Sequence, residues 1–150
     1  PVGKNKLVII NDGFVHLNTT HWKGAGVAIP VFSLRSNKSA GVGEFADIKL
    51  LVDWANKVGL KLIQILPIND TTATHTWMDS YPYAAISAFA LHPMFIRLNL
   101  VANKEQQALL KPYADTIAEL NAMAEIDYDG VMSLKWEVLR LLYSKNGKLL

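Results

Sequence analysis

The clearest pattern of apolar positions lies between residues 45 and 58. Apolar side chains recur there at spacings of three and four, at Ile48, Leu51, Val52, Ala55 and Val58. This period places them on one face and predicts an amphipathic helix over Phe45–Val58. Gly59 follows at once and predicts the end of the helix, because glycine is common just past a helix C-terminus.

Two short and mainly apolar runs flank this helix. One is Gly26–Phe32, which is rich in β-branched residues, and the other is Leu60–Leu66, which ends at Pro67. Such runs are typical of buried strands, and strands that a helix connects pair in parallel. The pattern therefore predicts a β-α-β unit, with a polar loop over Ser33–Gly43 before the helix.

The rest of the chain is less regular. Ile68–Tyr83 predicts a long polar and aromatic loop, a kind of segment that is often functional in compact domains. Ile86–Phe89 and Met94–Asn99 are short apolar pieces. Helices are predicted over Lys104–Ala124 and Val131–Tyr143, so the fold class is α/β with a helical part after the two strands.

The first residues have a pattern of their own. Lys6–Ile10 and Phe14–Leu17 predict two short strands joined by a turn, and His21–Gly24 predicts a linker. Pro1 is not an initiator methionine, and Leu150 follows a helical segment with no closing element. We therefore expect a piece of a longer chain.

Composition excludes several classes of function. The net charge is +2 and the lysines and arginines form no run, so a nucleic-acid partner is not predicted. The absence of cysteine excludes disulfides and thiolate metal sites and is compatible with the cytoplasm. No apolar run approaches the roughly 20 residues of a membrane span, so no membrane partner is predicted either.

The sequence predicts no cofactor and no metal. The histidines, at positions 16, 21, 75 and 92, show no metal-ligand spacing. Gly41 and Gly43 precede a helix, as glycines do in dinucleotide-binding loops, but the next glycine is Gly59 at the far end of that helix. The dinucleotide fingerprint is therefore incomplete.

Polar and aromatic residues follow both predicted strands. The strand ends carry Phe32–Ser36 and Pro67–Asp70, and the long loop adds His75, Trp77, Asp79, Ser80, Tyr81 and Tyr83. Ligands of parallel α/β structures bind beyond the carboxyl ends of the strands. Aromatic rings beside short polar groups suit a sugar, which has apolar C–H faces and many hydroxyls.

Each of these residues also has a purely structural interpretation. Trp77 or Tyr83 could fill a gap in the core. Asp70 and Asp79 could accept hydrogen bonds from nearby backbone, as aspartate does in turns. Arg35 could form a surface or structural ion pair. Pattern alone does not decide between these interpretations and sugar binding.

Five motifs occur in one order over roughly Trp22–Leu98: Gly26–Ser36, Gly41–Phe45, Gln64–Thr71, Trp77–Tyr83 and Ser87–Pro93. In this order and spacing they resemble the start of the catalytic domain of glycoside hydrolase family 77, the 4-α-glucanotransferases or amylomaltases. The likeness is strongest to the long disproportionating enzymes of the plant cytosol and their bacterial relatives.

The resemblance implies a (β/α)₈ barrel, with the two predicted strands as its first two. It implies transfer of α-1,4-glucan segments between malto-oligosaccharides by a retaining double displacement in the cytoplasm, within the metabolism of starch and maltose. The two catalytic carboxylates are expected on later strands, so no catalytic residue is assigned here. Residues 1–21 would be a linker or the tail of a preceding starch-binding region, and residues 22–150 the N-terminal part of the catalytic barrel. The expected partners are the glucans and the remainder of the catalytic domain.

The resemblance also assigns three substrate-binding residues. Tyr83 matches the tyrosine that lines the glycone side of the cleavage point, and Asp79 and Ser80 match the positions that shape the donor site. Tyr81 is an extra residue relative to shorter amylomaltases, and His92 stands where those enzymes often have asparagine. Two rivals remain: a non-catalytic glucan-binding module, and an enzyme of another α/β class that uses Asp70 as acid or base.

Overall fold

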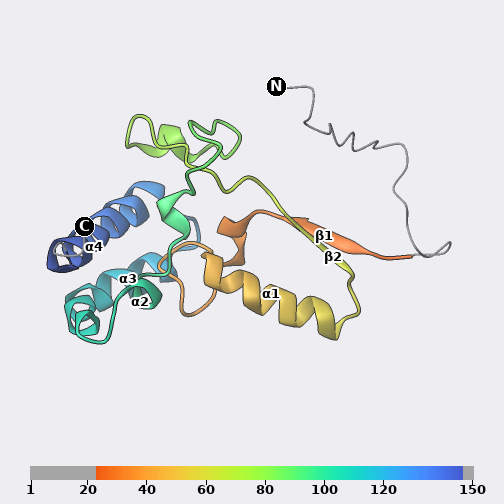
Figure 1. Ribbon diagram of the computed structural model, residues 1–150, viewed down its shortest axis with the longest axis horizontal. Helices are drawn as coiled ribbons and strands as arrows, with labels where there is room; N and C mark the ends of the chain where they lie inside the picture. Colours follow the sequence, from red (N-terminus) through yellow and green to blue (C-terminus); the bar gives the residue numbers. More distant parts are fainter. Residues whose placement is uncertain (1–22, 147–150) are drawn as a thin grey trace, which may run out of the picture.

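The computed structural model describes residues 23–146. Its helices and strands are β1 (Gly26–Ile29), η2 (Val31–Leu34), α1 (Phe45–Lys57), β2 (Leu62–Ile65), η3 (Trp77–Ser80), η4 (Pro93–Phe95), α2 (Leu98–Val101), η5 (Gln106–Tyr113), α3 (Ala114–Ala122) and α4 (Tyr128–Asn146), where η marks a 3₁₀ helix. Figure 1 shows the two strands and α1 at one end of the molecule, and α2, α3 and α4 at the other.

The predicted β-α-β unit is confirmed, but the prediction that its strands are buried is wrong within residues 23–146. Strands β1 and β2 pair in parallel, with Gly26 opposite Leu62 and Ile29 opposite Ile65, and α1 lies between them in the chain. The first strand is shorter than predicted. Pro30 follows it and has no N–H to donate to a neighbouring strand, and the chain turns at once into η2, where the Ser33 N–H donates to the Pro30 carbonyl at 3.2 Å.

Helix α1 is confirmed within one residue of its predicted bounds. A capping box fixes its start, because the Glu44 side chain accepts from the N–H of Asp47 while the Asp47 side chain accepts from the N–H of Glu44. Gly59 ends it with a φ of 79°. The predicted apolar stripe is only partly covered, however: Ala55 is buried, whereas Val52 and Val58 are exposed.

Gly41 and Gly43 prove to have a packing role. A Cβ at Gly43 would overlap the Val31 carbonyl oxygen, and the Gly43 N–H donates to the Phe32 carbonyl at 2.9 Å. A glycine is therefore required for the chain to pass this close to the turn after β1. At Gly41, whose φ is 79°, a Cβ would lie 2.9 Å from Leu120 and Val131, so packing accounts for this glycine as well.

The C-terminal half is helical, with corrected boundaries. The predicted helix Lys104–Ala124 is instead η5 followed by α3, and Pro112 lies inside η5, where its ring and missing N–H disfavour a continuous α-helix. Helix α4 contains the predicted Val131–Tyr143 and extends it at both ends.

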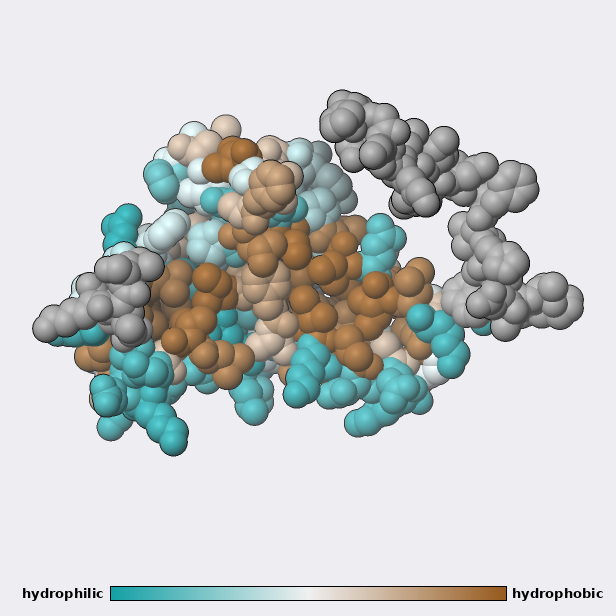
Figure 2. Space-filling model, in the orientation of Figure 1, coloured by the Kyte–Doolittle hydropathy of each residue, from teal (hydrophilic) through white to brown (hydrophobic). Residues whose placement is uncertain are grey.

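The core lies in this helical half. Its buried members come from η2, the loop before α1, η4, α2, α3 and α4, and include Val31, Val42, Phe95, Val131 and Val138. The sheet contributes none of them, and Leu62 is 58% exposed. Figure 2 shows apolar residues gathered over the part of the surface that carries α1 and the strands. This end of the molecule therefore presents apolar side chains that nothing covers within residues 23–146.

Two expectations concern other parts of the chain. The predicted strands Lys6–Ile10 and Phe14–Leu17 lie outside the described residues. Within residues 23–146, no helix combines the length and the apolar character that crossing a membrane requires.

Candidate functional site

The segment from residue 69 to residue 92, here called the aromatic loop, is closed by its own backbone. Asn69 and Leu91 form an antiparallel bridge, and the Asp70 N–H donates to the Ala90 carbonyl at 2.9 Å. The Ile86 N–H in turn donates to the Asp70 carbonyl at 2.9 Å. These bonds tie the two ends of the loop together and leave its middle part, with η3, projecting at the top of Figure 1.

Asp79 organises that middle part. Its side chain is 6% exposed, and its carboxylate accepts backbone N–H bonds from Ala73 at 3.1 Å, Thr74 at 2.9 Å and His75 at 2.7 Å. Its carbonyl oxygen accepts a hydrogen bond from the Thr71 hydroxyl at 2.5 Å. Burial acts to raise the pKa of Asp79, but the hydrogen bonds from Thr74, His75 and Ala73 outweigh it and lower that pKa.

The backbone interpretation of the two aspartates is therefore confirmed. Asp79 binds three N–H groups of its own loop, and Asp70 accepts the Thr72 N–H at 2.9 Å. His75 has a φ of 60°, in the left-handed region that few non-glycine residues adopt. Its N–H bond to Asp79 helps to hold that conformation. The Asp79 carboxylate thus faces its own loop and stabilises the loop's shape.

The aromatic side chains of the loop lie on its outside. Tyr83 is 59% exposed and its ring centroid lies 5.7 Å from that of Tyr81, at an interplanar angle of 45°. Trp77 is also exposed, so the interpretation of Trp77 or Tyr83 as core filling is wrong for residues 23–146. Exposed ring faces of this kind can stack on the C–H face of a pyranose.

Ser80 is exposed and lies at the end of η3, the short helix that Thr76 caps by accepting the Met78 N–H at 3.3 Å. It borders a hollow of about 390 Å³ that η3, η2 and the start of α4 with its preceding residues surround. The hollow is lined by Phe32, Trp77, Ser80, Ile126, Asp127, Tyr128 and Asp129. The structure thus brings Tyr83, Ser80 and Asp79 into one loop, with Tyr83 outside this hollow.

A buried polar cluster beneath the loop was missed at the sequence level. The imidazole of His92 lies 3.3 Å from the Tyr128 hydroxyl through Nε2, and both residues are buried. Burial lowers the pKa of His92, although the charges of Asp70 and Asp79 act in the opposite direction. The sequence offered only the position of His92 in its motif as a signal and gave none for Tyr128.

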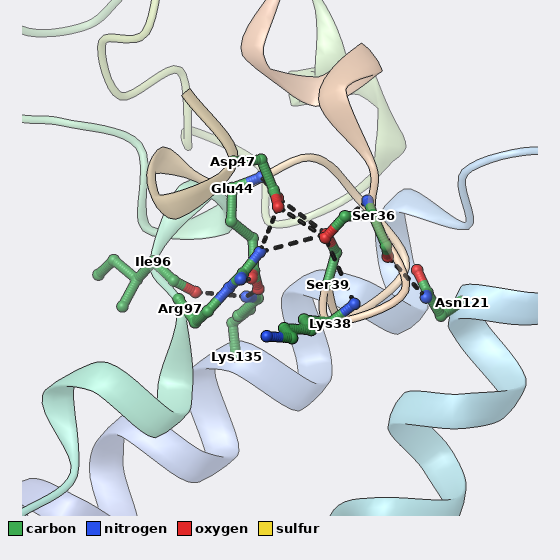
Figure 3. A network of polar contacts seen from close by, with 9 residues as sticks. All are labelled: Ser36, Lys38, Ser39, Glu44, Asp47, Ile96, Arg97, Asn121 and Lys135. Atoms are coloured by element: carbon green, nitrogen blue, oxygen red, sulfur yellow. Dashed lines mark hydrogen bonds and ion pairs between the residues drawn. The ribbon is translucent and has the colours of Figure 1, made fainter. Parts of the chain in front are cut away.

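A second feature missed by sequence reasoning is a network of buried charges, shown in Figure 3. Arg97 Nε donates to Glu44 at 2.5 Å and Nη2 to Asp47 at 2.6 Å, while Lys135 Nζ contacts the other Glu44 oxygen and the Ile96 carbonyl. Asp47 also accepts from the hydroxyls of Ser36 and Ser39 at 2.7 and 2.8 Å. The network joins the loop after β1 and the start of α1 to α4.

The pKa values reflect this pairing. Burial opposes the charge on Arg97, but Glu44 and Asp47 outweigh it and raise the pKa of the guanidinium. Burial likewise acts to raise the pKa of Asp47, yet hydrogen bonds from Ser36 and Arg97 lower it. Burial lowers the pKa of Lys135, and Glu44 offsets this only in part. Two carboxylates and two cations therefore share one buried space.

Arg35 does not form the ion pair that the sequence allowed, within residues 23–146. The three ion pairs found within residues 23–146 all belong to the network and none involves Arg35, whose Nη1 is buried without a hydrogen-bond partner. In the same described part of the chain, no group of three histidine, cysteine, aspartate or glutamate side chains could hold a metal ion.

Comparison with known proteins gives a consistent result. Residues 29–149 match the model of glycosyl hydrolase family 77, described as 4-alpha-glucanotransferase. The chain is 41% identical over 142 residues to 4-alpha-glucanotransferase DPE2 of Oryza sativa subsp. japonica. This alignment covers 93% of the chain and 14% of the rice protein. It is 36% identical over 118 residues to a 4-alpha-glucanotransferase of Chlamydia caviae, covering 79% of the chain and 21% of the relative.

The chain therefore spans about a fifth or less of the length of these curated relatives. The family match nevertheless covers most residues of the chain. It includes α1, which connects the two strands, as well as the aromatic loop and the network of buried charges. On this evidence the chain belongs to glycosyl hydrolase family 77, the 4-alpha-glucanotransferase family.

Proposed function

We propose that this chain is the N-terminal part of the catalytic domain of a longer 4-alpha-glucanotransferase, called the parent enzyme below. The observation that carries the proposal is the family match over residues 29–149, together with relatives of that name that are several times longer. Within the parent enzyme, residues 22–150 belong to the catalytic domain. Residues 1–21 form a linker or the tail of a preceding starch-binding region.

In this proposal β1 and β2 are the first two strands of a (β/α)₈ barrel. Their parallel pairing, with α1 as the connection between them, supports this arrangement. The exposed apolar side chains of the sheet and α1, such as Leu62 and Val52, also support it. Further strands and helices of the parent enzyme would cover them, because apolar surface of this size is stabilised by burial.

The reaction we propose is transfer of α-1,4-glucan segments between malto-oligosaccharides by a retaining double displacement. That chemistry needs a carboxylate nucleophile and a carboxylic acid/base about 5 Å apart. We place both on later strands of the parent enzyme. Asp79 does not suit either role, because its carboxylate already accepts three backbone N–H groups, and Asp70 accepts the Thr72 N–H.

The contribution we assign to this chain is recognition of the donor sugar by the aromatic loop. Tyr83 offers an exposed ring for stacking and a hydroxyl for a hydrogen bond, and exposed Ser80 offers a second hydroxyl. Asp79 acts indirectly by fixing the loop on which they stand. Binding energy of this kind promotes reaction by holding the donor in the orientation that the catalytic carboxylates require.

Product analysis of the parent enzyme with maltotriose tests this function. Transfer moves a glucosyl segment to a second sugar, so glucose should appear together with oligosaccharides longer than maltotriose. Glucose and maltose alone would indicate hydrolysis and contradict the transferase assignment. Binding of maltotriose without either set of products would favour the rival interpretation, a non-catalytic glucan-binding module.

A further inference from the structure

The internal hydrogen bonds of the aromatic loop fix its shape but not its place on the molecule. The Asp79 carboxylate, the Thr71 hydroxyl and the Asp70 backbone all bond to other residues of the same loop. Tyr128 is different, because it belongs to α4 and its hydroxyl meets His92 at the end of the loop. The contact therefore joins the loop to a separate helix.

The geometry of His92 defines the direction of this contact. Its Nδ1 accepts the backbone N–H of Met94 at 3.2 Å, which leaves the proton of the neutral ring on Nε2. Nε2 then donates to the Tyr128 hydroxyl at 3.3 Å, and the two rings meet edge to face with their centroids 6.1 Å apart. Both side chains are more than nine-tenths buried, so water does not compete readily for the bond.

The surroundings of Tyr128 extend this contact into the loop. Burial and the negative charge of Asp79 raise the pKa of Tyr128 to about 12, against a smaller opposing effect of the neighbouring Thr72 hydroxyl. Thr71, Thr72 and Asp79 are themselves buried. The phenol thus stays protonated and lies under the part of the loop that Asp79 organises.

Helix α4 is a firm support for such a contact. Val131, Leu134 and Val138 are core residues, and Lys135 is fully buried in its pairing with Glu44. Tyr128 is the first residue of the helix and points its hydroxyl at His92.

We propose that Tyr128 and His92 are positioning residues, which hold the aromatic loop against α4 and so place Tyr83 for donor binding. This inference rests on the proposed function of the loop.

Tyr128→Phe in the full-length parent enzyme removes only the hydroxyl and leaves the ring. Hydrogen exchange of the loop amides is the direct measurement. The Ala73, Thr74 and His75 N–H groups are protected by the buried carboxylate of Asp79, and η3, which carries Asp79, packs against α4. Release of the loop from α4 would therefore admit water to these bonds. The loss of one hydrogen bond changes an equilibrium constant by roughly threefold to tenfold. We expect loop exchange to accelerate by about that factor, and the KM for maltotriose to rise by a similar factor, with little change in kcat.

Two substitutions of His92 separate its two hydrogen bonds. Gln places an amide nitrogen near the position of Nε2, so His92→Gln should keep the bond to Tyr128 and exchange nearly as slowly as the wild type. Asn places its oxygen near Nδ1 but does not reach Tyr128, so His92→Asn should resemble Tyr128→Phe. Tyr113→Phe is the matched control, since the Tyr113 hydroxyl also reaches α4, where it donates to Glu137 at 2.8 Å. Tyr113→Phe should change neither the exchange of the loop amides nor the KM for maltotriose.

The outcomes distinguish this inference from the proposed function. Unchanged loop exchange in both Tyr128→Phe and His92→Asn would overturn the support by α4. Faster exchange with an unchanged KM would overturn the positioning role, provided that Tyr83→Ala raises the KM. If Tyr83→Ala leaves the KM unchanged, the donor-binding function fails and the positioning role fails with it.

Discussion

Two regions of the molecule fix their polar groups in opposite ways. The buried network of Glu44, Asp47, Arg97 and Lys135 joins segments that are up to 91 residues apart, and water has almost no access to its charges. Within the aromatic loop, hydrogen bonds join residues at most 20 positions apart, and the rings of Trp77, Tyr81 and Tyr83 remain in water.

The difference predicts where a substitution will be felt. Removing one member of a buried charge pair leaves an uncompensated charge, and the cost falls on the whole folded unit. Removing a ring or hydroxyl from the outside of a closed loop alters few contacts. We therefore expect the network to control stability and the loop to control sugar recognition. The following variants of the parent enzyme test this division, from the largest expected effect on the free energy of unfolding to the smallest.

Glu44→Gln should have the largest effect. Glutamine preserves the shape of the side chain but removes the carboxylate that faces both Arg97 and Lys135. Because Lys135 is fully buried, its charge would be left without a carboxylate partner. Breaking a buried pair in this way costs about 3–5 kcal/mol. Urea unfolding should show this loss in the free energy of unfolding.

Asp53→Asn is the matched control on the same helix. Asp53 is exposed and takes no part in the three ion pairs of residues 23–146. Its substitution should change the free energy of unfolding by no more than about 0.5 kcal/mol. Equal losses in Glu44→Gln and Asp53→Asn would show that the network has no special role in stability.

Lowering the pH should destabilise the folded state through His92. Its pKa is lowered in the folded state from an ordinary value of 6.5, so the folded state disfavours the proton that the unfolded state binds. This contribution to stability is complete above pH 6.5 and is lost as the pH falls through the folded pKa. One such group gives a slope of at most about 1.4 kcal/mol per pH unit.

His92→Asn should remove that slope between pH 7 and pH 5 in urea unfolding. The carboxylates Asp47 and Asp79 do not interfere in this range, since their pKa values are lowered from 3.8 and their contributions are lost only at more acidic pH. A slope that persists unchanged in His92→Asn would assign the pH dependence to another group.

Asp79→Asn should destabilise less than Glu44→Gln but disturb the loop more than a ring substitution. Asparagine keeps one oxygen acceptor but introduces an NH₂ group that faces the N–H donors of Ala73, Thr74 and His75. The melting temperature should fall slightly, and the KM for maltotriose should rise several-fold. Wild-type values for both would show that the loop keeps its shape without this carboxylate.

Local features of the fold could be predicted from sequence because short-range rules produce them. The spacing of apolar residues from Ile48 to Val58 predicted α1, and Gly59 predicted its end. The helix break near Pro112 and the early end of β1 at Pro30 were missed, although a proline marks both positions. In each case the apolar pattern continues past the proline, but the backbone cannot continue the same strand or helix there because proline has no N–H to donate.

The candidate site was only partly predictable for a related reason. The motif placed Tyr83, Ser80 and Asp79 together, and turn chemistry predicted the backbone bonds of Asp79. The contact between His92 and Tyr128 spans 36 positions, and the pairing of Glu44 with Lys135 spans 91. No local pattern encodes such pairings, because they arise only when the helices pack.

Tyr83 should show the smallest effect on stability and a clear effect on activity. Its side chain is 59% exposed, so both Tyr83→Phe and Tyr83→Ala should keep the free energy of unfolding within about 0.5 kcal/mol of the wild type. A lost hydrogen bond costs about 0.5–1.5 kcal/mol, so Phe should lower kcat/KM for maltotriose by up to roughly tenfold. Ala removes the ring as well and should lower it distinctly more.

Tyr143→Ala is the control that sharpens this prediction, because Tyr143 is 64% exposed but stands on α4. If exposed rings in general stabilise or aid catalysis, the two alanine variants should behave alike. If the aromatic loop recognises the donor sugar, only Tyr83→Ala should lose activity while both melt like the wild type. Wild-type transfer kinetics in well-folded Tyr83→Ala would refute sugar binding by this ring, and a large drop in its melting temperature would instead assign Tyr83 to packing within the parent enzyme.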